Sequence, residues 1–371
     1  MPHIFFTVFE MGRAVNSDVA GSWSCPAPSD GDPDVISLTH GEGGRLSRKL
    51  IRDRILPALG ASARGDLSDS AVLEGHRFGI AGSSMAFTTD GYTVSPLFFP
   101  GGDIGRLAVF GTVNDLAVAG AIPRWLSLSM ILEEGLSGNI LQRVLESVRS
   151  ACEIAQVQIV TGDTKVVPRG AVDGMFLTTS GIGELSSAAP PGVQGIQPDD
   201  VIIVSGPIGA HGAAVLCARE HFNFDPPPQS DCAPLTEPIQ AILNRGLIPR
   251  AMRDATRGGV AAVLHEWTGE INISATLIED QIPVSAPVRA VCELLGLDPV
   301  HLANEGTFLL ATPASQAERT VQMLREFDVT RDAAVIGRFI PSRRTSVSLM
   351  RISGREVPLD EPLGAPLPRI C

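Results

Sequence analysis

The chain has 371 residues, of which 44% are hydrophobic and 19% are charged, and it contains 38 glycines and 28 prolines. This composition is typical of globular domains with a sizeable core and excludes a disordered or fibrous chain. The 29 basic and 41 acidic residues give a formal net charge of −12, so the surface repels phosphodiester backbones and anionic lipid. We therefore expect neither a nucleic acid nor a membrane as partner.

The sequence offers no export or membrane signal. The most apolar stretch, residues 201–218, is interrupted by Ser205, Pro207 and His211 and is too short for a spanning helix. The first ten residues lack a basic start and a long apolar run, which argues against a signal peptide. We expect a cytoplasmic protein with reduced thiols. None of the six cysteines forms a Cys-x-x-Cys pair, so a zinc cage is not predicted.

Strand-like and helix-like patterns mix along the chain and predict an α+β fold. Residues 1–34 have no clear period and are expected to be a loosely ordered extension. The turn at residues 190–192 is expected to separate an N-terminal domain, 35–188, from a C-terminal domain, 189–345, with a further segment at 346–371. In chain order we expect helix 46–55, strand 84–89, helix 103–121, strand 125–132, helix 137–155, strands 157–160, 175–185 and 201–204, helices 211–220, 234–245 and 258–267, strand 271–276, helix 286–295, strand 307–312, helix 313–327 and strand 334–339.

Four aspartates lie at expected element ends beside Gly, Thr or Asn. Magnesium prefers oxygen ligands, commonly one or two carboxylates together with waters and substrate phosphates. Converging carboxylates of this kind could hold a magnesium-bound nucleotide, and an ammonium group nearby would balance the phosphate charge. For each aspartate alone, a turn or helix-cap role is the alternative. The candidates are Asp69, Asp90, Asp115 and Asp163, with Asn114, Thr164 and Lys165 beside them.

Two glycine-rich segments precede expected helices, where free backbone amides and the helix dipole attract anions. The first runs from His40 to Gly44 and the second from Arg253 to Gly259. An ordinary turn is the alternative for each. The candidate nucleotide-binding residues in them are Gly41, Gly43, Gly44, Asp254, Thr256, Gly258 and Gly259.

The tail Leu359–Cys371 contains three prolines and one glycine, so we expect it to be extended and mobile. A terminal cysteine on such an arm could carry a group into a site and out again. The alternative is a disordered end that happens to finish in cysteine. Glu305, in Asn304-Glu305-Gly306, is either a turn residue or a carboxylate base facing the site.

Together these motifs resemble the hydrogenase expression/formation protein HypE family, within the aminoimidazole-ribonucleotide-synthetase-like superfamily. The resemblance covers residues 36–371. It leaves 1–34 without a counterpart, and the family's paired acids near residue 68 appear here as Ser68-Asp69. The matching runs begin at Thr88, Gly111, Ile131, Val160, Arg253 and Ala303, and the chain ends in Pro-Arg-Ile-Cys371.

The resemblance implies a homodimer in which the N-terminal domains of two copies form a shared barrel, with ATP bound between the domains. It also implies that a carbamoyltransferase, HypF, loads a carbamoyl group on Cys371. The protein then uses ATP and Mg²⁺ to dehydrate this thiocarboxamide to a thiocyanate. The nitrile passes to iron on a HypC–HypD scaffold as a cyanide ligand of nickel–iron hydrogenase.

The implied chemistry assigns roles to the candidate residues. Dehydration through a phosphorylated amide oxygen needs a metal, a phosphate cradle and a base. The hypothesis assigns the four aspartates to magnesium, Lys165 and Asn114 to the phosphates, Glu305 to proton acceptance and His40 as the reserve base. Two alternatives stay open: a synthetase or kinase acting on a free small molecule, and a scaffold without enzymatic activity.

Overall fold

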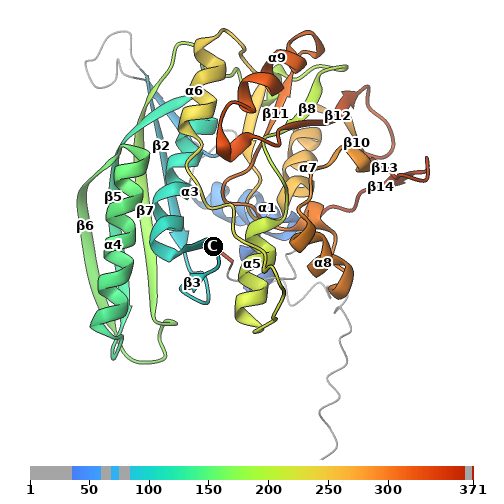
Figure 1. Cartoon of the computed structure of the whole chain (residues 1–371). Helices are drawn as coiled ribbons and strands as arrows, with labels where there is room; N and C mark the ends of the chain where they lie inside the picture. Colours follow the sequence, from blue (N-terminus) through green and yellow to red (C-terminus); the bar gives the residue numbers. More distant parts are fainter. Residues whose placement is uncertain (1–35, 60–67, 75–83, 364–369) are drawn as a thin grey trace, which may run out of the picture. The chain divides into compact units, whose positions relative to one another are not determined.

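The computed structural model describes residues 36–59, 68–74, 84–363, 370 and 371. Contacts divide the chain into two units, Met1–Ser37 and Leu38–Cys371. All described helices and strands belong to the second unit (Figure 1). The expected extension at 1–34 lies outside the described residues.

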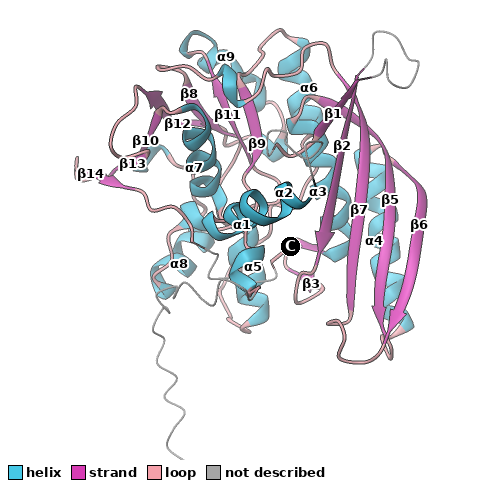
Figure 2. Ribbon diagram, turned by 180° about the vertical axis from the view of Figure 1, so that it is seen from behind, coloured by secondary structure: helices cyan, strands magenta, loops and turns pink. Residues whose placement is uncertain are grey.

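A five-stranded sheet in the order β1-β2-β7-β5-β6 forms the first half of this unit. Neighbouring strands are antiparallel except β5 and β6, which run parallel. Helices α3 and α4 lie over one face of the sheet (Figures 1 and 2). The bounds are β1 Ala71–Glu74, β2 Ser84–Tyr92, α3 Ile104–Val118, β5 Ala121–Glu133, α4 Gly138–Ala155, β6 Gln158–Val167 and β7 Met175–Leu185.

Helix α3 is buried along nearly its whole length because it contacts the sheet, α4 and α6. This explains its apolar, small-residue composition, since a helix without a polar face must be covered on all sides. Asp103 caps its first turn by accepting hydrogen bonds from the amides of Gly105 (2.8 Å) and Arg106 (3.1 Å). The expected helix at 137–155 is confirmed as α4, with Ser137 as its cap.

A seven-stranded sheet in the order β14-β13-β10-β12-β8-β11-β9 forms the second half. Strand β8 is buried on both faces of the sheet, which explains its continuous apolar run: Ile202 and Val204 pack in the core with α7, and Ile203 packs in the core with α6 and α9. The bounds are β8 Val201–Val204, α5 Ala210–Arg219, α6 Thr236–Asn244, β9 Ala251–Asp254, α7 Gly259–Ile271, β10 Ser274–Ile278, α8 Ala286–Leu295, β11 Phe308–Thr312, α9 Ala314–Leu324, β12 Ala334–Ile340, β13 Val347–Met350 and β14 Glu356–Pro358.

Short elements join and flank the two sheets. The expected helix at 46–55 is formed by α1 and a π-helical turn, and α2 continues it beyond residue 55. The segment expected at 346–371 begins with β13 and β14, so the second sheet continues beyond residue 345. These elements are α1 Arg45–Leu50, the π-helical turn Ile51–Ile55, α2 Leu56–Leu59, the hairpin β3 Phe98–Phe99 with β4 Gly102–Asp103, and 3-10 turns at Leu38–Gly41, Val193–Gly195, Glu279–Gln281, Pro299–His301 and Asp328–Thr330.

Strand β6 differs most from its expectation. It continues through Thr161–Lys165, which the sequence analysis placed after a short strand. Nine residue pairs with β5, from Trp125–Gln158 to Glu133–Val167, hold this segment extended. None of the described helices is long and apolar enough to cross a membrane.

Candidate active site

A cavity of about 450 Å³ lies where segments from both halves of the unit meet. The first half contributes the segment before α1, the end of β2 and the middle of α3, and the second half contributes the β9–α7 loop. The last residue of the chain also lines it. Among the lining residues are His40, Gly41, Gly43, Asp69, Asp90, Asp115, Asp254, Thr256, Arg257, Glu305 and Cys371.

Three carboxylates, which we call the acid cluster, come together in this cavity: Asp69, Asp115 and Asp254. Each offers an oxygen within 4.8 Å of the others. Burial raises the pKa of Asp115 and of Asp254 well above the usual range, and the neighbouring carboxylates raise them further. Burial also raises the pKa of Asp69, to about 6. Like charges this close favour a cation between them, so the donor set fits a divalent metal such as Mg²⁺.

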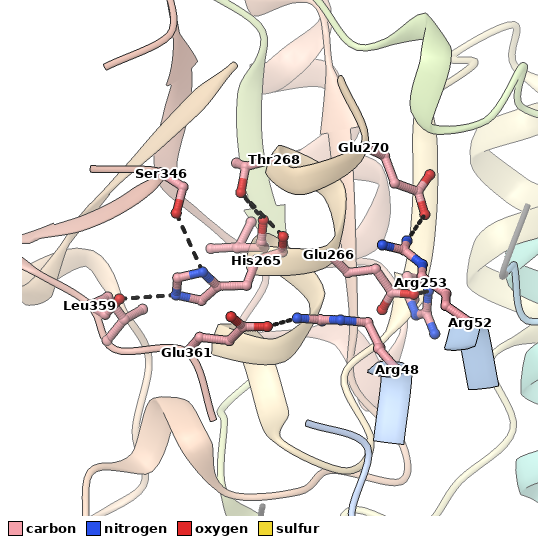
Figure 3. A network of polar contacts seen from close by, with 11 residues as sticks. Arg48, Arg52, Arg253, His265, Glu266, Thr268, Glu270, Ser346, Leu359 and Glu361 are labelled. Carbon is pink, nitrogen blue, oxygen red and sulfur yellow. Dashed lines mark hydrogen bonds and ion pairs between the residues drawn. The ribbon is translucent and has the colours of Figure 1, made fainter. Parts of the chain in front are cut away.

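Arg253 supplies a positive charge beside the acid cluster. The sequence predicted no role for this arginine apart from its place beside the glycines. Its guanidinium lies 3.1 Å from Asp69 Oδ1. It also lies 2.9 Å from Glu266 Oε1 on α7, as Figure 3 shows. The surrounding carboxylates raise the pKa of Arg253 against the opposing effect of burial. Arg253 therefore offsets part of the negative charge that the acid cluster carries when it is ionised.

Asp90 also lines the cavity, near the end of β2. Burial raises its pKa, while the charge of Arg257 and a hydrogen bond donated by Tyr92 Oη (3.2 Å) lower it. Gly111 allows this arrangement, because a Cβ there would lie 2.4 Å from the Tyr92 hydroxyl oxygen. Gly111 begins one of the runs on which the family resemblance rests, but the sequence alone does not indicate why a glycine is needed there.

Glu305 and Cys371 share the cavity. Glu305 is buried, and its Oε1 has no hydrogen-bond partner among the described residues. Burial raises its pKa well above normal, and nearby aspartates, Asp254 first, raise it further. Asp231 fixes the turn by accepting hydrogen bonds from the amides of Glu305 and Gly306, both at 3.0 Å. Burial raises the pKa of the Cys371 thiol to about 12, although the charge of Arg257 opposes that rise.

The tail is fixed well before its last residue. The segment Leu359–Pro362, which we call the outer anchor, runs beside α1 and α7 (Figure 3). Gly44 is part of this contact, because a Cβ there would lie 2.3 Å from the Pro362 carbonyl oxygen. The contacts of the anchor are His265 Nε2 to Leu359 O (2.9 Å), His301 Nε2 to Asp360 O (3.1 Å), an Arg48–Glu361 ion pair and Arg45 N to Pro362 O (2.9 Å).

Known proteins resemble the chain over most of its length. Models of the AIR synthase related protein family match its N-terminal domain at residues 67–185 and its C-terminal domain at 197–350. The carbamoyl dehydratase HypE of Escherichia coli K12 is 44% identical over 338 residues, which is 91% of this chain and 99% of that protein. A HypE–HypF complex contains a chain with TM-score 0.78 and 38% identity, covering 84% of this chain and 99% of that one. A HypE in complex with ATP has TM-score 0.75 and 41% identity, covering 91% and 100%.

This chain belongs to the HypE family. The expected resemblance and the two-domain AIR-synthase-related α+β fold are thereby confirmed. The E. coli relative is a hydrogenase maturation protein by its description.

Asn114, which the sequence predicts to bind the phosphates, lies in a supporting position in the structure. Its side chain is buried, and it is not among the residues that line the cavity. Its amide nitrogen donates to the carbonyls of Ala233 (3.0 Å) and Glu305 (3.3 Å), and its oxygen accepts from the amide of Leu235 (2.8 Å). With its donors and acceptor occupied, Asn114 joins α3 to the loop that supports Glu305 instead of binding phosphate in this conformation.

Asp163, Thr164 and Lys165 also lie apart from the acid cluster of their own chain. They are exposed on β6, and Lys165 Nζ pairs with Asp163 Oδ2 at 3.3 Å. Backbone hydrogen bonding at Thr164, followed by Lys165, lowers the pKa of Asp163. The physical reason is the extended course of β6, which ends one side of the sheet instead of turning toward β2 and α3.

Both glycine segments contribute to the cavity, but not through all of their glycines. His40, Gly41 and Gly43 line it from the first segment, and Arg253, Asp254, Thr256 and Arg257 line it from the second. Gly258 and Gly259 do not; their positive φ values (77° and 60°) form the start of α7. Glu42, which the sequence analysis passed over, is buried with Oε2 unpaired among the described residues, and burial raises its pKa.

Proposed function

We propose that this chain uses ATP to dehydrate a carbamoyl group carried on its own Cys371, giving a thiocyanate and supplying cyanide for a nickel–iron hydrogenase. The observation that supports this most directly is the place of Cys371, whose side chain lines the same cavity as the acid cluster and Glu305. A phosphorylating site and a terminal thiol have no common purpose in a kinase acting on a free molecule.

The reaction balances without another reagent. The thiocarboxamide oxygen attacks the γ-phosphorus of ATP, and the bond from that phosphorus to ADP breaks. The resulting imidate loses its oxygen as phosphate while both N–H protons leave, which forms the carbon–nitrogen triple bond. The sum converts R–S–C(=O)NH₂ and ATP to R–S–C≡N, ADP and phosphate.

The described residues divide this chemistry among them. The acid cluster would hold Mg²⁺, which supplies charge neutralisation for the phosphates. Asp90 is a further candidate ligand, and Arg257 interacts electrostatically with both Cys371 and Asp90. Glu305 accepts a proton from the nitrogen, because it lines the cavity with Oε1 unpaired among the described residues and its carboxylate is strongly basic once ionised. His40 lines the cavity as the reserve base.

We propose that two copies pair through their N-terminal sheets and form a shared barrel. Strand β6 supports this, since it is an edge strand exposed along almost its whole length. It displays Val160 at 59% and Val166 at 68% exposure, and an open apolar edge of this kind favours association. Pairing would bring Asp163, Thr164 and Lys165 of each copy to the shared surface.

We propose two partners, which the family resemblance implies. A HypF-type carbamoyltransferase loads Cys371, and a HypC–HypD iron scaffold receives the nitrile. The domain division 35–188, 189–345 and 346–371 stays a prediction.

Mass spectrometry of the intact protein tests the function. The protein is incubated with HypF, carbamoyl phosphate and ATP, and we expect addition of one carbamoyl group followed by loss of one water. Without Mg²⁺ the second change should stop. The same mass changes in Cys371→Ala would overturn the proposal.

A further inference from the structure

The last two residues, which we call the inner anchor, are held through their backbone by both halves of the unit. The amide and Oγ1 of Thr93 donate to Cys371 O at 2.8 and 3.1 Å. From the other side, His211 Nε2 lies 2.5 Å from Ile370 O. The Ile370 side chain is 2% exposed and packs into the core. Figures 1 and 2 place the chain end beside β3 and α5.

The surroundings of His211 fix which ring nitrogen carries the proton. His211 is fully buried on α5, and its Nδ1 lies 2.9 Å from Ser230 Oγ. Ser230 Oγ already accepts a hydrogen bond from the amide of Cys232 (3.2 Å), so its hydroxyl proton is available to Nδ1. Nε2 then carries the hydrogen and donates to Ile370 O. Phe99 contacts the ring edge-on, with centroids 5.3 Å apart, and restricts its rotation.

We propose that His211 and Thr93 are positioning residues that hold the C-terminal dipeptide so that the Cys371 side chain enters the cavity beside Glu305. This deepens the proposed function and rests on it, because it concerns how Cys371 presents its substrate. The hydrogen bonds from Thr93 and His211 are all made to backbone oxygens of the inner anchor, and none of them involves the sulfur. Thr93 and His211 can therefore hold the inner anchor in the same way whether the thiol is free, carbamoylated or converted to the thiocyanate.

Protection of the Cys371 thiol from alkylation tests the anchor without carbamoyl phosphate, HypF or ATP. The full-length protein is treated with iodoacetamide, and alkylation is followed by mass spectrometry of the peptide 357–371 released by cleavage after Glu356. In the wild type we expect alkylation much slower than in the synthetic peptide. His211→Met removes the donor at similar length, and Thr93→Val removes the hydroxyl at similar shape. We expect each to speed alkylation about fivefold, the effect of one lost hydrogen bond.

Rescue separates hydrogen bonding from packing. His211→Gln keeps an N–H at nearly the same reach, so we expect alkylation close to the wild-type rate. His221→Met, at an exposed histidine two residues beyond α5, and Thr276→Val on β10 are matched controls expected to leave the rate unchanged.

The proposal is overturned if wild-type Cys371 reacts as fast as the peptide, if His211→Met and Thr93→Val both react at the wild-type rate, or if His211→Gln reacts as fast as His211→Met. Because alkylation requires no catalysis, the anchor can be established even if no nitrile forms. Conversely, nitrile formation by a protein whose tail fails these tests would support the function and reject the anchor.

Discussion

Asp115 lies among several other carboxylates of the cavity. Burial makes the largest contribution to its raised pKa, and the charges of Asp254, Asp90 and Asp69 raise that pKa further. Asp115→Asn should therefore raise the melting temperature of the metal-free protein, because it relieves buried repulsion. It should also lower Mg²⁺-dependent ATP turnover by about 100-fold or more, because a ligand is lost. Asp332→Asn, at an exposed turn before β12, is the control for both measurements. A variant with lower metal-free stability and full turnover would contradict the assignment.

The same carboxylates predict how stability changes with pH. A raised pKa means that the folded protein binds protons more tightly than the unfolded chain. The free energy of unfolding should then be largest at low pH and fall as pH rises through the folded pKa, which for Asp69 is about 6. Melting with a chelator at pH 5 and pH 8 should show this fall. Mg²⁺ should restore stability mainly at pH 8; an equal effect at both values would argue against metal binding by the cluster.

A substitution at Glu305 distinguishes nucleotide binding from proton transfer. Glu305→Gln keeps the size of the buried side chain but cannot accept a proton. We expect ATP affinity, measured by calorimetry, to stay within about twofold, and nitrile formation to fall about 100- to 10,000-fold, the usual range for a lost general base. Glu293→Gln on the exposed face of α8 is the control. Full nitrile formation by Glu305→Gln would move the base elsewhere, with His40 the next candidate.

At the scale of elements, the start of α7 depends on a glycine that was expected to bind phosphate. At Gly259, φ is +60°, and a Cβ would lie 2.6 Å from the carbonyl oxygens of Val300 and Leu302. Gly259→Ala should lower the free energy of unfolding by about 1–3 kcal/mol. Gly269→Ala in the same helix, where a Cβ meets nothing within 4 Å, should instead raise it by about 0.5–1 kcal/mol. Urea unfolding of both variants measures the difference, and equal effects would refute it.

Strand β6 shows where local sequence signals are overruled. Gly162, Asp163 and Thr164 are turn-forming residues, so the sequence predicts that a short strand ends before them. Pairing with β5 outweighs this preference, because each ladder position supplies backbone hydrogen bonds that no local signal records. Helix α4, in contrast, was predictable, since its cap and its apolar stripe are both local features.

At the scale of the whole molecule, two copies should associate through β6. Val166→Lys places a charge on the exposed edge and should shift the protein from dimer to monomer in sedimentation while leaving its melting temperature nearly unchanged. Ile352→Lys, at a residue 77% exposed beyond β13, is the matched control and should leave the dimer intact. A wild-type monomer at micromolar concentration would reject the shared barrel.

Much of the site was predictable because strand and helix ends converge in a fold of this kind. Asp69, Asp115 and Cys371 were expected to meet, and they do line one cavity. The partners of those residues were not predictable. Asn114 is satisfied by a loop more than a hundred residues away, and His211 faces a residue 159 positions along the chain. A single sequence contains no signal for contacts of that range.

The outer anchor sets how far the sulfur can travel. While Pro362 stays bound to α1, only the eight residues 364–371, the last of which is Cys371, follow the fixed chain. Fully extended, they span at most about 26–29 Å. The range of movement of the Cys371 sulfur is therefore limited. An enzyme that loads or unloads the sulfur must bring its catalytic centre within that distance of the outer anchor. Insertion of residues between the outer anchor and Cys371 should allow a partner enzyme to reach the sulfur from a greater distance.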